Sequence, residues 1–262
     1  MIRQKTTHLI TFLRNIRLGT FIDAVKYSKF IIDIALLNCF NNSGNKSIQY
    51  DDVFILSSCI NQRDANFFNF NNKQTEFERF SEVCTSVESV RSVYPMSKIV
   101  YLDNSKLNPD YEEYLKKIVD DYQNYSDHGL MVQARGIKNK GIPWSLTNLL
   151  YLLGDNKFLN AKNVHLMNGR YLITEKTLMN ALNSTADNYL YIKFKNLNVS
   201  VIYLLFRNVA NKVIAFEFKI ACIMSVTGFS VEDVFGLFRL KTKYIQKLGL
   251  HGKINGEQQN AE

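Results

Sequence analysis

The chain has 262 residues, of which 46% are hydrophobic and 21% charged, and it contains three prolines and twelve glycines. These values exclude a collagen-like, linker-rich or disordered chain and are typical of a folded domain with a substantial core. The formal net charge of +8 favours anionic partners, namely nucleotides, phosphosugars, nucleic acid or an anionic lipid surface.

The four cysteines, Cys39, Cys59, Cys84 and Cys222, form neither CxxC pairs nor Cys/His pairs at metal-site spacing. Because a secretory signal pattern is also lacking, we expect a cytoplasmic protein with reduced, mostly buried thiols. No uninterrupted apolar run approaches the roughly 20 residues that span a bilayer.

Residues 1–48 are predicted to form a basic, amphipathic helical extension that includes the polar linker 41–45. Over residues 1–30, six Lys and Arg stand against one Asp, and apolar residues recur between them at helical spacing. This pattern fits helices lying on an anionic membrane surface, which would place the protein peripherally on the inner face of the membrane. The alternative is a helix that packs on the domain and exposes its basic side.

The first predicted strand is the continuous apolar run 53–60, typical of a strand covered on both faces. It contains Ser57 and Ser58 near its end, and Asn61 follows it. A capping box of Thr75 and Glu78 predicts the start of the next helix. Its buried face is expected to carry the apolar residues Phe77, Phe80, Cys84, Val87 and Val90.

The second predicted strand, residues 97–105, ends in a polar tip with Asp103 and Asn104. Pro109 then stands at the first position of another helix, whose buried face is expected to carry Leu115 and Tyr122. This β-α-β-α order predicts parallel strands with right-handed crossovers. Ligands of such sheets lie beyond the carboxyl ends of the strands, where these polar residues are found.

Residues 134–144 form a basic loop that contains glycine and leads into a leucine-rich helix. Lys138, Lys140 and Gly141 could hold a phosphate there, because free N–H groups and the helix dipole both favour an anion. The spacing of a Walker loop is absent. The alternative is a solvated basic turn.

Residues 163–174 predict a buried strand, a polar break at Asn168, Gly169 and Arg170, and then a new helix. The three break residues are candidates to face a substrate. The alternative is an ordinary turn in which Gly169 has a positive φ. Further strands are expected at 189–194 and 199–206, a helix at 212–224, and a disordered tail at 257–262.

The order of these pieces resembles the GT-A-type glycosyltransferases that use nucleotide sugars, and especially bacterial and viral members of surface polysaccharide synthesis. The resemblance is carried by residues 53–59, 77–89 and 99–105, and by Lys140-Gly141 with the helix after them, and it spans roughly residues 52–256. It implies an α/β fold with a GT-A-like, Rossmann-type, mostly parallel sheet flanked by helices, as a domain over residues 49–256. It also implies transfer of a sugar from a nucleotide-sugar donor to a glycan or lipid-linked acceptor.

The chain departs from that family at its metal motif. Where typical members carry Asp-x-Asp, which holds a divalent ion against the donor diphosphate, this chain has Asn168-Gly169-Arg170. Asn and Arg cannot replace paired carboxylates as ligands of a hard cation, but Arg can bind diphosphate directly. We therefore expect a metal-independent enzyme without a cofactor, in which Arg170, Lys138 and Lys140 stabilise the leaving nucleotide.

The remaining donor contacts are expected from the two strand tips, namely Ser57, Ser58, Asn61, Asp103 and Asn104. Some family members place a metal or phosphate ligand at the position of His251. Glu217 is the candidate base for the acceptor hydroxyl, because burial in an apolar helix would raise the pKa of its carboxyl group. Alternatively, Glu217 pairs with Arg207 or Lys219 or simply faces solvent.

Two other functions remain open from the sequence. The first is a non-catalytic, membrane-associated assembly protein on the same fold, since the acidic motif is missing. The second is a nucleic-acid-binding protein, although no recognition motif is present and the basic residues concentrate at the N-terminus and in one loop. A Rossmann oxidoreductase or methyltransferase is disfavoured because the first strand lacks G-x-G-x-x-G after it.

Overall fold

The computed structural model describes residues 24–38, 49–62, 74–137, 139, 141–154, 157–173, 189–193, 199–207, 211–237, 243–245, 250–254 and 257–261. Its centre is a seven-stranded sheet in the order β3-β2-β1-β4-β7-β6-β8. The strands are β1 (Tyr50–Ser58), β2 (Lys98–Asp103), β3 (Asp121–Asn124), β4 (Ala161–Asn168), β6 (Tyr189–Lys193), β7 (Val199–Arg207) and β8 (Lys243–Ile245).

Strands β1 to β4 run parallel, and β7 lies antiparallel between β4 and β6. Strand β8 runs parallel to β6. The predicted α/β class, a mostly parallel sheet flanked by helices, is therefore confirmed.

A second sheet has the order β10-β9-β5, built from β5 (Leu172–Ile173), β9 (Leu250–Ile254) and β10 (Glu257–Ala261). Two expectations fail here. Residues 172–173 form a strand where a helix was expected, and residues 257–261, expected to be a disordered tail, pair antiparallel with β9. Strand β5 pairs with β9, which is distant in the sequence, and β10 carries no alternation of apolar residues. Neither strand therefore has a local signal in the sequence.

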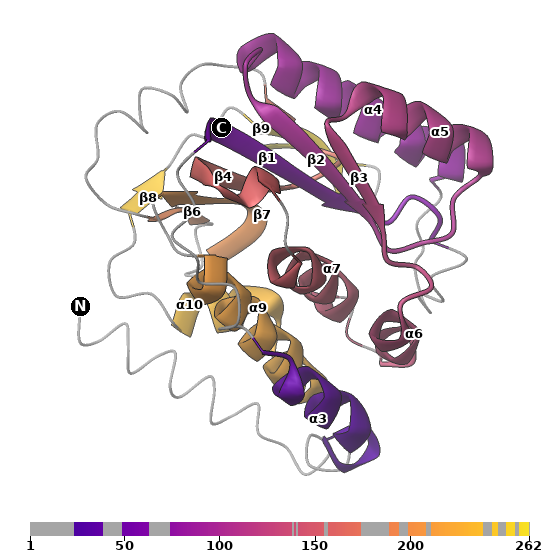
Figure 1. The fold of residues 1–262 in the computed structure, drawn as a ribbon, viewed down its shortest axis with the longest axis vertical. Helices are drawn as coiled ribbons and strands as arrows, with labels where there is room; N and C mark the ends of the chain where they lie inside the picture. Colours follow the sequence, from indigo (N-terminus) through magenta and orange to yellow (C-terminus); the bar gives the residue numbers. More distant parts are fainter. Residues whose placement is uncertain are drawn as a thin grey trace.

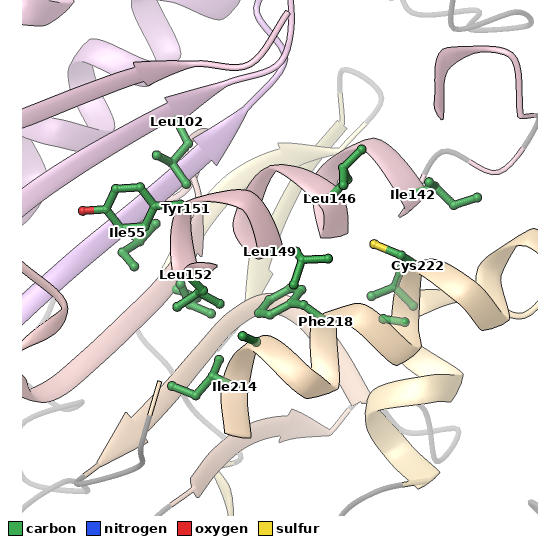
Figure 2. Packing of buried hydrophobic residues seen from close by; sticks show 14 of the residues in the cluster. Ile55, Leu102, Ile142, Leu146, Leu149, Tyr151, Leu152, Ile214, Phe218 and Cys222 are labelled. Carbon is green, nitrogen blue, oxygen red and sulfur yellow. The ribbon is translucent and has the colours of Figure 1, made fainter. Parts of the chain in front are cut away.

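Helices cover both faces of the large sheet (Figure 1). One face carries α4 (Glu76–Val93) and α5 (Pro109–Ile118). The other face carries α6 (Gly129–Arg135), α7 (Gly141–Leu153), α9 (Asn211–Val226) and α10 (Val231–Leu237). Helix α3 (Ser28–Leu36) packs outside α9. A short 3-10 helix, η1 (Lys157–Leu159), precedes β4. Each face has its own apolar core, and on the α7 side Leu149 and Phe218 meet between α7 and α9 (Figure 2).

The local signals that start the helices are confirmed. The Thr75 hydroxyl accepts from the Glu78 amide at 3.1 Å, and the Glu78 carboxylate accepts from the Thr75 amide at 2.6 Å. Pro109 stands at the first position of α5, after Asn108 as the cap. The predicted buried face of α4 is confirmed for Val87 and Val90, and Phe80 and Cys84 are partly buried against the same core. It is wrong for Phe77, which is 61% exposed, and it omitted the buried Val83.

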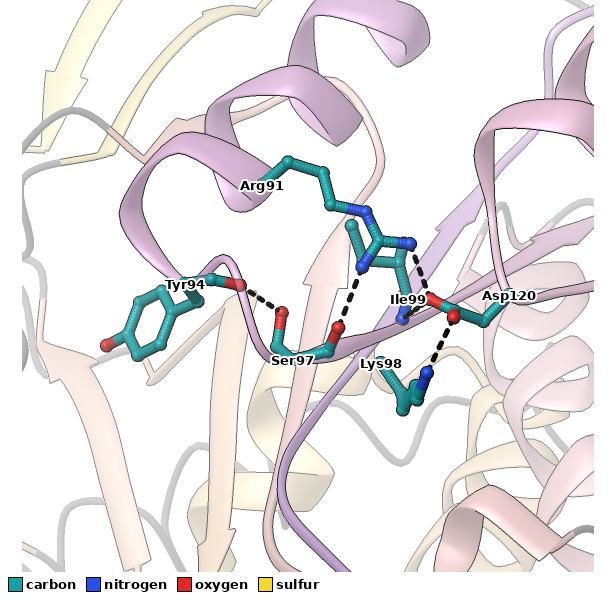
Figure 3. Close-up of polar contacts among 6 residues, drawn as sticks. All are labelled: Arg91, Tyr94, Ser97, Lys98, Ile99 and Asp120. Atoms are coloured by element: carbon teal, nitrogen blue, oxygen red, sulfur yellow. Dashed lines mark hydrogen bonds and ion pairs between the residues drawn. The ribbon is translucent and has the colours of Figure 1, made fainter.

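Strand β3 was missed because it is short and polar, so it shows no apolar alternation. Tyr122, expected on the buried face of α5, lies in this strand. Beside it, Asp120 accepts hydrogen bonds from Arg91 and from the Ile99 amide and pairs with Lys98 (Figure 3). This clamp ties α4, β2 and β3 together at the amino ends of the strands, opposite the edge where ligands of such sheets bind.

The described part of the N-terminal extension is α3, and it belongs to the packed domain. Phe30 and Ile34 are buried, and α3 contacts α6 and α9. The Lys219 ammonium donates to the Ala35 and Leu37 carbonyls, both at 2.6 Å, and so caps the end of α3. None of the described helices is long and apolar enough to cross a membrane.

Candidate functional site

The carboxyl ends of β1, β2 and β4 lie side by side in the middle of the large sheet. Ser58 is in register with Asp103, and Ser57 with Asn168. Most of the predicted donor-binding residues lie at this edge of the sheet: Ser57, Ser58, Asn61, Asp103, Asn104, Asn168, Gly169 and Arg170. These side chains do not share one surface, because successive residues of a strand point to opposite faces of the sheet.

The side facing α7 is rich in carboxamides, and Arg135 of α6 donates to the Asn104 carbonyl there at 2.9 Å. The Asn148 side chain donates to the Ser57 hydroxyl at 3.2 Å, and the Asn104 side chain donates to the Thr147 hydroxyl at 3.3 Å. The Oδ1 atoms of both Asn104 and Asn148 are buried without a hydrogen-bond partner in the described part of the chain. Buried polar atoms are nearly always paired, so two unmatched acceptors at one strand edge suit a ligand that offers N–H or O–H donors.

Asp103 has a different role from the expected one. Its Oδ2 accepts from the Tyr101 hydroxyl at 2.7 Å and the Ile60 amide at 3.3 Å, and its Oδ1 accepts from the Ser105 amide and hydroxyl at 2.7 and 2.6 Å. The side chain is fully buried, and burial raises its pKa to about 6. Since both oxygens are engaged by the protein, Asp103 holds the tips of β1 and β2 together and does not offer an oxygen to a ribose or base.

Asn61 is tied into the same loop. Its amide donates to the Ser105 hydroxyl at 3.0 Å, and its side-chain nitrogen donates to the Lys106 carbonyl at 3.0 Å. Asp103, Ser105 and Asn61 therefore form one hydrogen-bonded frame that sets the path of the chain after β1.

The side facing α4 is cationic. Arg79 is only 2% exposed, and its Nη1 donates to the Cys59 carbonyl at 3.1 Å, directly after β1. The Nε atom of Arg79 and the Nη1 atom of Arg170 are both buried without a partner among the described residues. Burial, and next the charge of Arg170, lower the pKa of Arg79 to about 10. With its carboxamide oxygen turned towards α4, Gln62 accepts from Nη1 and Nη2 of Arg79 at 3.1 and 2.7 Å. The buried donors left without a partner among the described residues are therefore Nε of Arg79 and Nη1 of Arg170, whose side chain is otherwise partly exposed.

Sequence reasoning missed Arg79, although a signal was present. Arg79 precedes Val83, Val87 and Val90 at helical spacing, so it occupies the first position of the buried stripe of α4. A charged residue on such a stripe is rare unless it is paired or binds a ligand.

Gly169 is required for close packing and not for an unusual backbone angle. A Cβ atom there would lie 3.3 Å from the Tyr101 ring and 3.4 Å from the Ser58 Cβ. The alternative of a positive φ is wrong, since Gly228 is the described glycine with that conformation. The Gly169 amide donates to the Ser57 carbonyl at 3.0 Å, which brings the next residue, Arg170, beside the end of β1.

The basic loop before α7 does not provide a free helix start. The Gly141 amide donates to the Asn139 side chain at 3.0 Å, and a Cβ on Gly141 would lie 2.3 Å from the Val231 side chain of α10. The Gly141 part of the phosphate-loop prediction is therefore wrong. Lys138 and Lys140 lie outside the described residues. His251 lies on strand β9 of the small sheet, where its backbone pairs with that of Leu172. Leu172 follows Arg170 by two residues.

Glu217 is not brought to the strand tips. Helix α9 lies on the far side of α7 from β1 and β2, and Phe218, next to Glu217, packs on Trp144 of α7 with ring centroids 5.4 Å apart. Burial does raise the pKa of Glu217 to about 8, in the expected direction. Lys219, one of its two suggested partners, donates to the carbonyls at the end of α3.

In the described ranges, no group of three or more His, Cys, Asp and Glu could hold a metal ion. Direct neutralisation of an anion by Arg79 and Arg170 is the chemistry that this edge offers.

Comparison with known proteins gives similarity only at the level of solved structures. No protein-family model and no curated protein sequence matches the chain. A 4-diphosphocytidyl-2C-methyl-D-erythritol synthase from Anaerococcus prevotii superposes with a TM-score of 0.42 at 14% identity, covering 80% of this chain and 90% of the other. The bifunctional IspDF from Campylobacter jejuni superposes with a TM-score of 0.41 at 12% identity, covering 79% of this chain and 51% of the other.

Proposed function

We propose that this protein is a glycosyltransferase that moves a sugar from a nucleotide-sugar donor to a glycan or lipid-linked acceptor without a metal ion. The observation that carries the proposal is the buried guanidinium group of Arg79 together with that of the partly exposed Arg170, beside the carboxyl end of β1.

The charges of Arg79 and Arg170 favour an anionic ligand. Burial, and to a smaller extent repulsion by the charge of Arg170, lower the pKa of Arg79, whereas the nearby acids Glu82 and Asp103 act in the opposite direction. An anion between the two guanidinium groups would remove that repulsion and fill the free N–H positions. A diphosphate carries enough negative charge for both groups and accepts the forked hydrogen bonds that Arg donates.

On the opposite side of the β1 tip, Asn104 and Asn148 present buried amide oxygens. Such acceptors suit the N–H groups of a base or the hydroxyl groups of a ribose or sugar. A ligand with one anionic part and one neutral, hydrogen-bonding part matches both sides of the tip.

In glycosyl transfer, the bond from the anomeric carbon to the diphosphate oxygen breaks, and the acceptor hydroxyl oxygen forms the new bond. Negative charge then develops on the leaving diphosphate, where Arg79 and Arg170 would stabilise it. The acceptor proton must pass to a base. Glu217 has a suitable pKa of about 8, but its place on α9 behind α7 argues against that role.

Calorimetric titration with a panel of nucleoside diphosphates, with and without Mg²⁺ or Mn²⁺, tests the proposal. We expect one nucleotide to bind without metal, and Arg79→Gln or Arg170→Gln to weaken its binding by at least about tenfold, the loss of one charge-assisted hydrogen bond. Arg91→Gln is the matched control, because Arg91 lies on the same helix α4 but binds Asp120 at the amino end of the strands.

Each alternative has its own outcome. Binding only with metal would overturn the role of the arginines, and absence of binding to any nucleotide would overturn the function. Binding without sugar transfer from any nucleotide-sugar donor would leave a non-catalytic protein on this fold.

A further inference from the structure

Helix α3 is apolar on two opposite faces. Phe30 and Ile34 are buried at 2% and 0% exposure against the domain. On the outer side, Val25, just before α3, is 61% exposed, and Ile32 and Leu36 are 55% and 77% exposed. Residues 25, 29, 32 and 36 follow helical spacing, so these apolar side chains form one stripe together with Lys29. We call Val25, Ile32 and Leu36 the outer stripe.

The outer stripe is held on a fixed support. The end of α3 is capped by Lys219 of α9, Asp33 accepts from the Gln133 side chain of α6 at 3.0 Å, and the Tyr27 hydroxyl donates to the Gly136 carbonyl at 3.1 Å. Three separate contacts therefore keep Phe30 and Ile34 inward and the outer stripe outward. Exposing three large apolar side chains on an ordered helix is unfavourable unless something else covers them.

The charges around the outer stripe identify what covers it. Lys26 and Lys29 are exposed beside it, whereas Asp33, the acid of α3, is turned towards Gln133. A symmetric contact with a second copy of the chain would bring the same apolar stripe and the same two lysines, and no exposed acid of α3 to pair with them. A surface that is both apolar and anionic would instead satisfy the stripe and the lysines together.

We propose that the outer stripe of α3, with Lys26 and Lys29, docks the protein on an anionic lipid surface. The apolar side chains enter the boundary between headgroups and acyl chains, and the ammonium groups contact the lipid phosphates. The proposal does not rest on the proposed function, because it requires only these exposed side chains.

The position of α3 has a consequence for the candidate site. Tyr27 contacts Gly136, and the neighbouring Arg135 donates to the Asn104 carbonyl at 2.9 Å. A lipid surface at α3 would thus lie on the side of the domain where the end of α6 meets the tip of β2.

The test is sedimentation of the full chain with vesicles of phosphatidylcholine alone or of equal parts phosphatidylcholine and phosphatidylglycerol. The test variant combines Val25→Gln, Ile32→Gln and Leu36→Gln, and glutamine keeps the helix propensity high. The matched control combines Phe77→Gln and Met96→Gln, which are 61% and 91% exposed. Phe77 belongs to α4, which covers the opposite face of the sheet from α3 (Figure 1), and Met96 lies in the turn between α4 and β2. Thermal unfolding confirms that each variant is folded.

We expect the unaltered chain to sediment with the mixed vesicles and not with phosphatidylcholine alone. The test variant should lower the partition coefficient by about tenfold or more, and the control should leave it unchanged. Lys26→Gln with Lys29→Gln should lower it by about fivefold for each lysine. Nucleotide titration of the test variant separates the two proposals, because lost vesicle binding with retained nucleotide binding concerns α3 alone.

Three results would overturn the proposal. The first is absence of binding to the mixed vesicles, and the second is equal sedimentation of the test variant and the unaltered chain. The third is a dimer in sedimentation velocity that the test variant converts to a monomer while vesicle binding persists, which would make a second copy the partner of the outer stripe.

Discussion

Replacement of Arg79 by methionine separates a ligand-binding arginine from a structural one. Burial and the charge of Arg170 lower the pKa of Arg79 from 12.5 to about 10, so keeping this group charged at neutral pH costs the folded state about 3 kcal/mol. Arg79→Met removes that cost. It also removes the hydrogen bond to the Cys59 carbonyl, which costs about 1–3 kcal/mol for a buried acceptor left unmatched.

The two contributions have opposite signs and similar size. We therefore expect the free energy of unfolding of Arg79→Met to lie within about 2 kcal/mol of the unaltered protein. A buried arginine whose role is structural would instead lose about 3–5 kcal/mol when removed. Methionine is chosen because it fills the space of the aliphatic stem without a charge.

The assay is urea unfolding at neutral pH, with and without pyrophosphate. If Arg79 and Arg170 bind the anion, pyrophosphate at a hundred times its dissociation constant should stabilise the unaltered protein by about 2.7 kcal/mol. Arg79→Met should lose most of this gain at the same concentration. Arg91→Met should lose about 1 kcal/mol of stability through its partly exposed ion pair with Asp120 and keep the full gain.

One combination of results would refute the reasoning. Suppose that Arg79→Met loses about 3–5 kcal/mol of unfolding free energy, and that pyrophosphate still stabilises the variant as much as it stabilises the unaltered protein. Arg79 is then a structural residue. The Arg170→Met variant repeats the comparison from the other side of the pair.

Three further predictions use the same unfolding assay. Gly169→Ala should cost about 1–3 kcal/mol and reduce the gain from pyrophosphate, because its Cβ would press on Tyr101 and Ser58 next to Arg170; an unchanged stability would show that the contact relaxes freely. Asp120→Asn should lose about 1–2 kcal/mol at neutral pH and keep the pyrophosphate gain. Burial alone would raise the pKa of Asp120, but hydrogen bonds from Ile99, Arg91 and Lys98 outweigh burial and lower it. The stabilisation that the Asp120 carboxylate provides should therefore be lost as the pH falls below about 4. Glu217→Gln should become more stable relative to the unaltered protein as the pH rises from about 4.5 to 8, by up to about 4 kcal/mol, since the raised pKa makes the ionised form unfavourable in the folded state. Nucleotide affinity should not change in Glu217→Gln, and a large loss would place Glu217 at the site.

The sequence alone determined the elements whose signals are local. The continuous apolar run of β1, the capping box of Thr75 and Glu78, and Pro109 at the start of α5 all act within a few residues of the chain. The meeting of the polar tips also followed from the sequence, because parallel strands linked by right-handed crossovers place their carboxyl ends at one edge.

The tertiary structure decided what each polar side chain does at that edge. Asp103 is engaged by Tyr101, Ile60 and Ser105, and the Ile60 amide comes from 43 residues away. Glu217 has the raised pKa expected of a buried acid, yet α7 lies between its helix and the tips. Neither fact can be obtained from spacing, since burial does not say which neighbour buries a residue.

The arginine pair shows the same limit most clearly. Arg170 was found because it follows a strand, whereas Arg79 lies in the first turn of α4, 91 residues earlier. Periodicity places Arg79 on the buried stripe of its helix, but only the packing of α4 on the sheet sets it against Cys59 and Arg170. Electrostatic interaction depends on distance in space, and that distance exists only once the chain has folded.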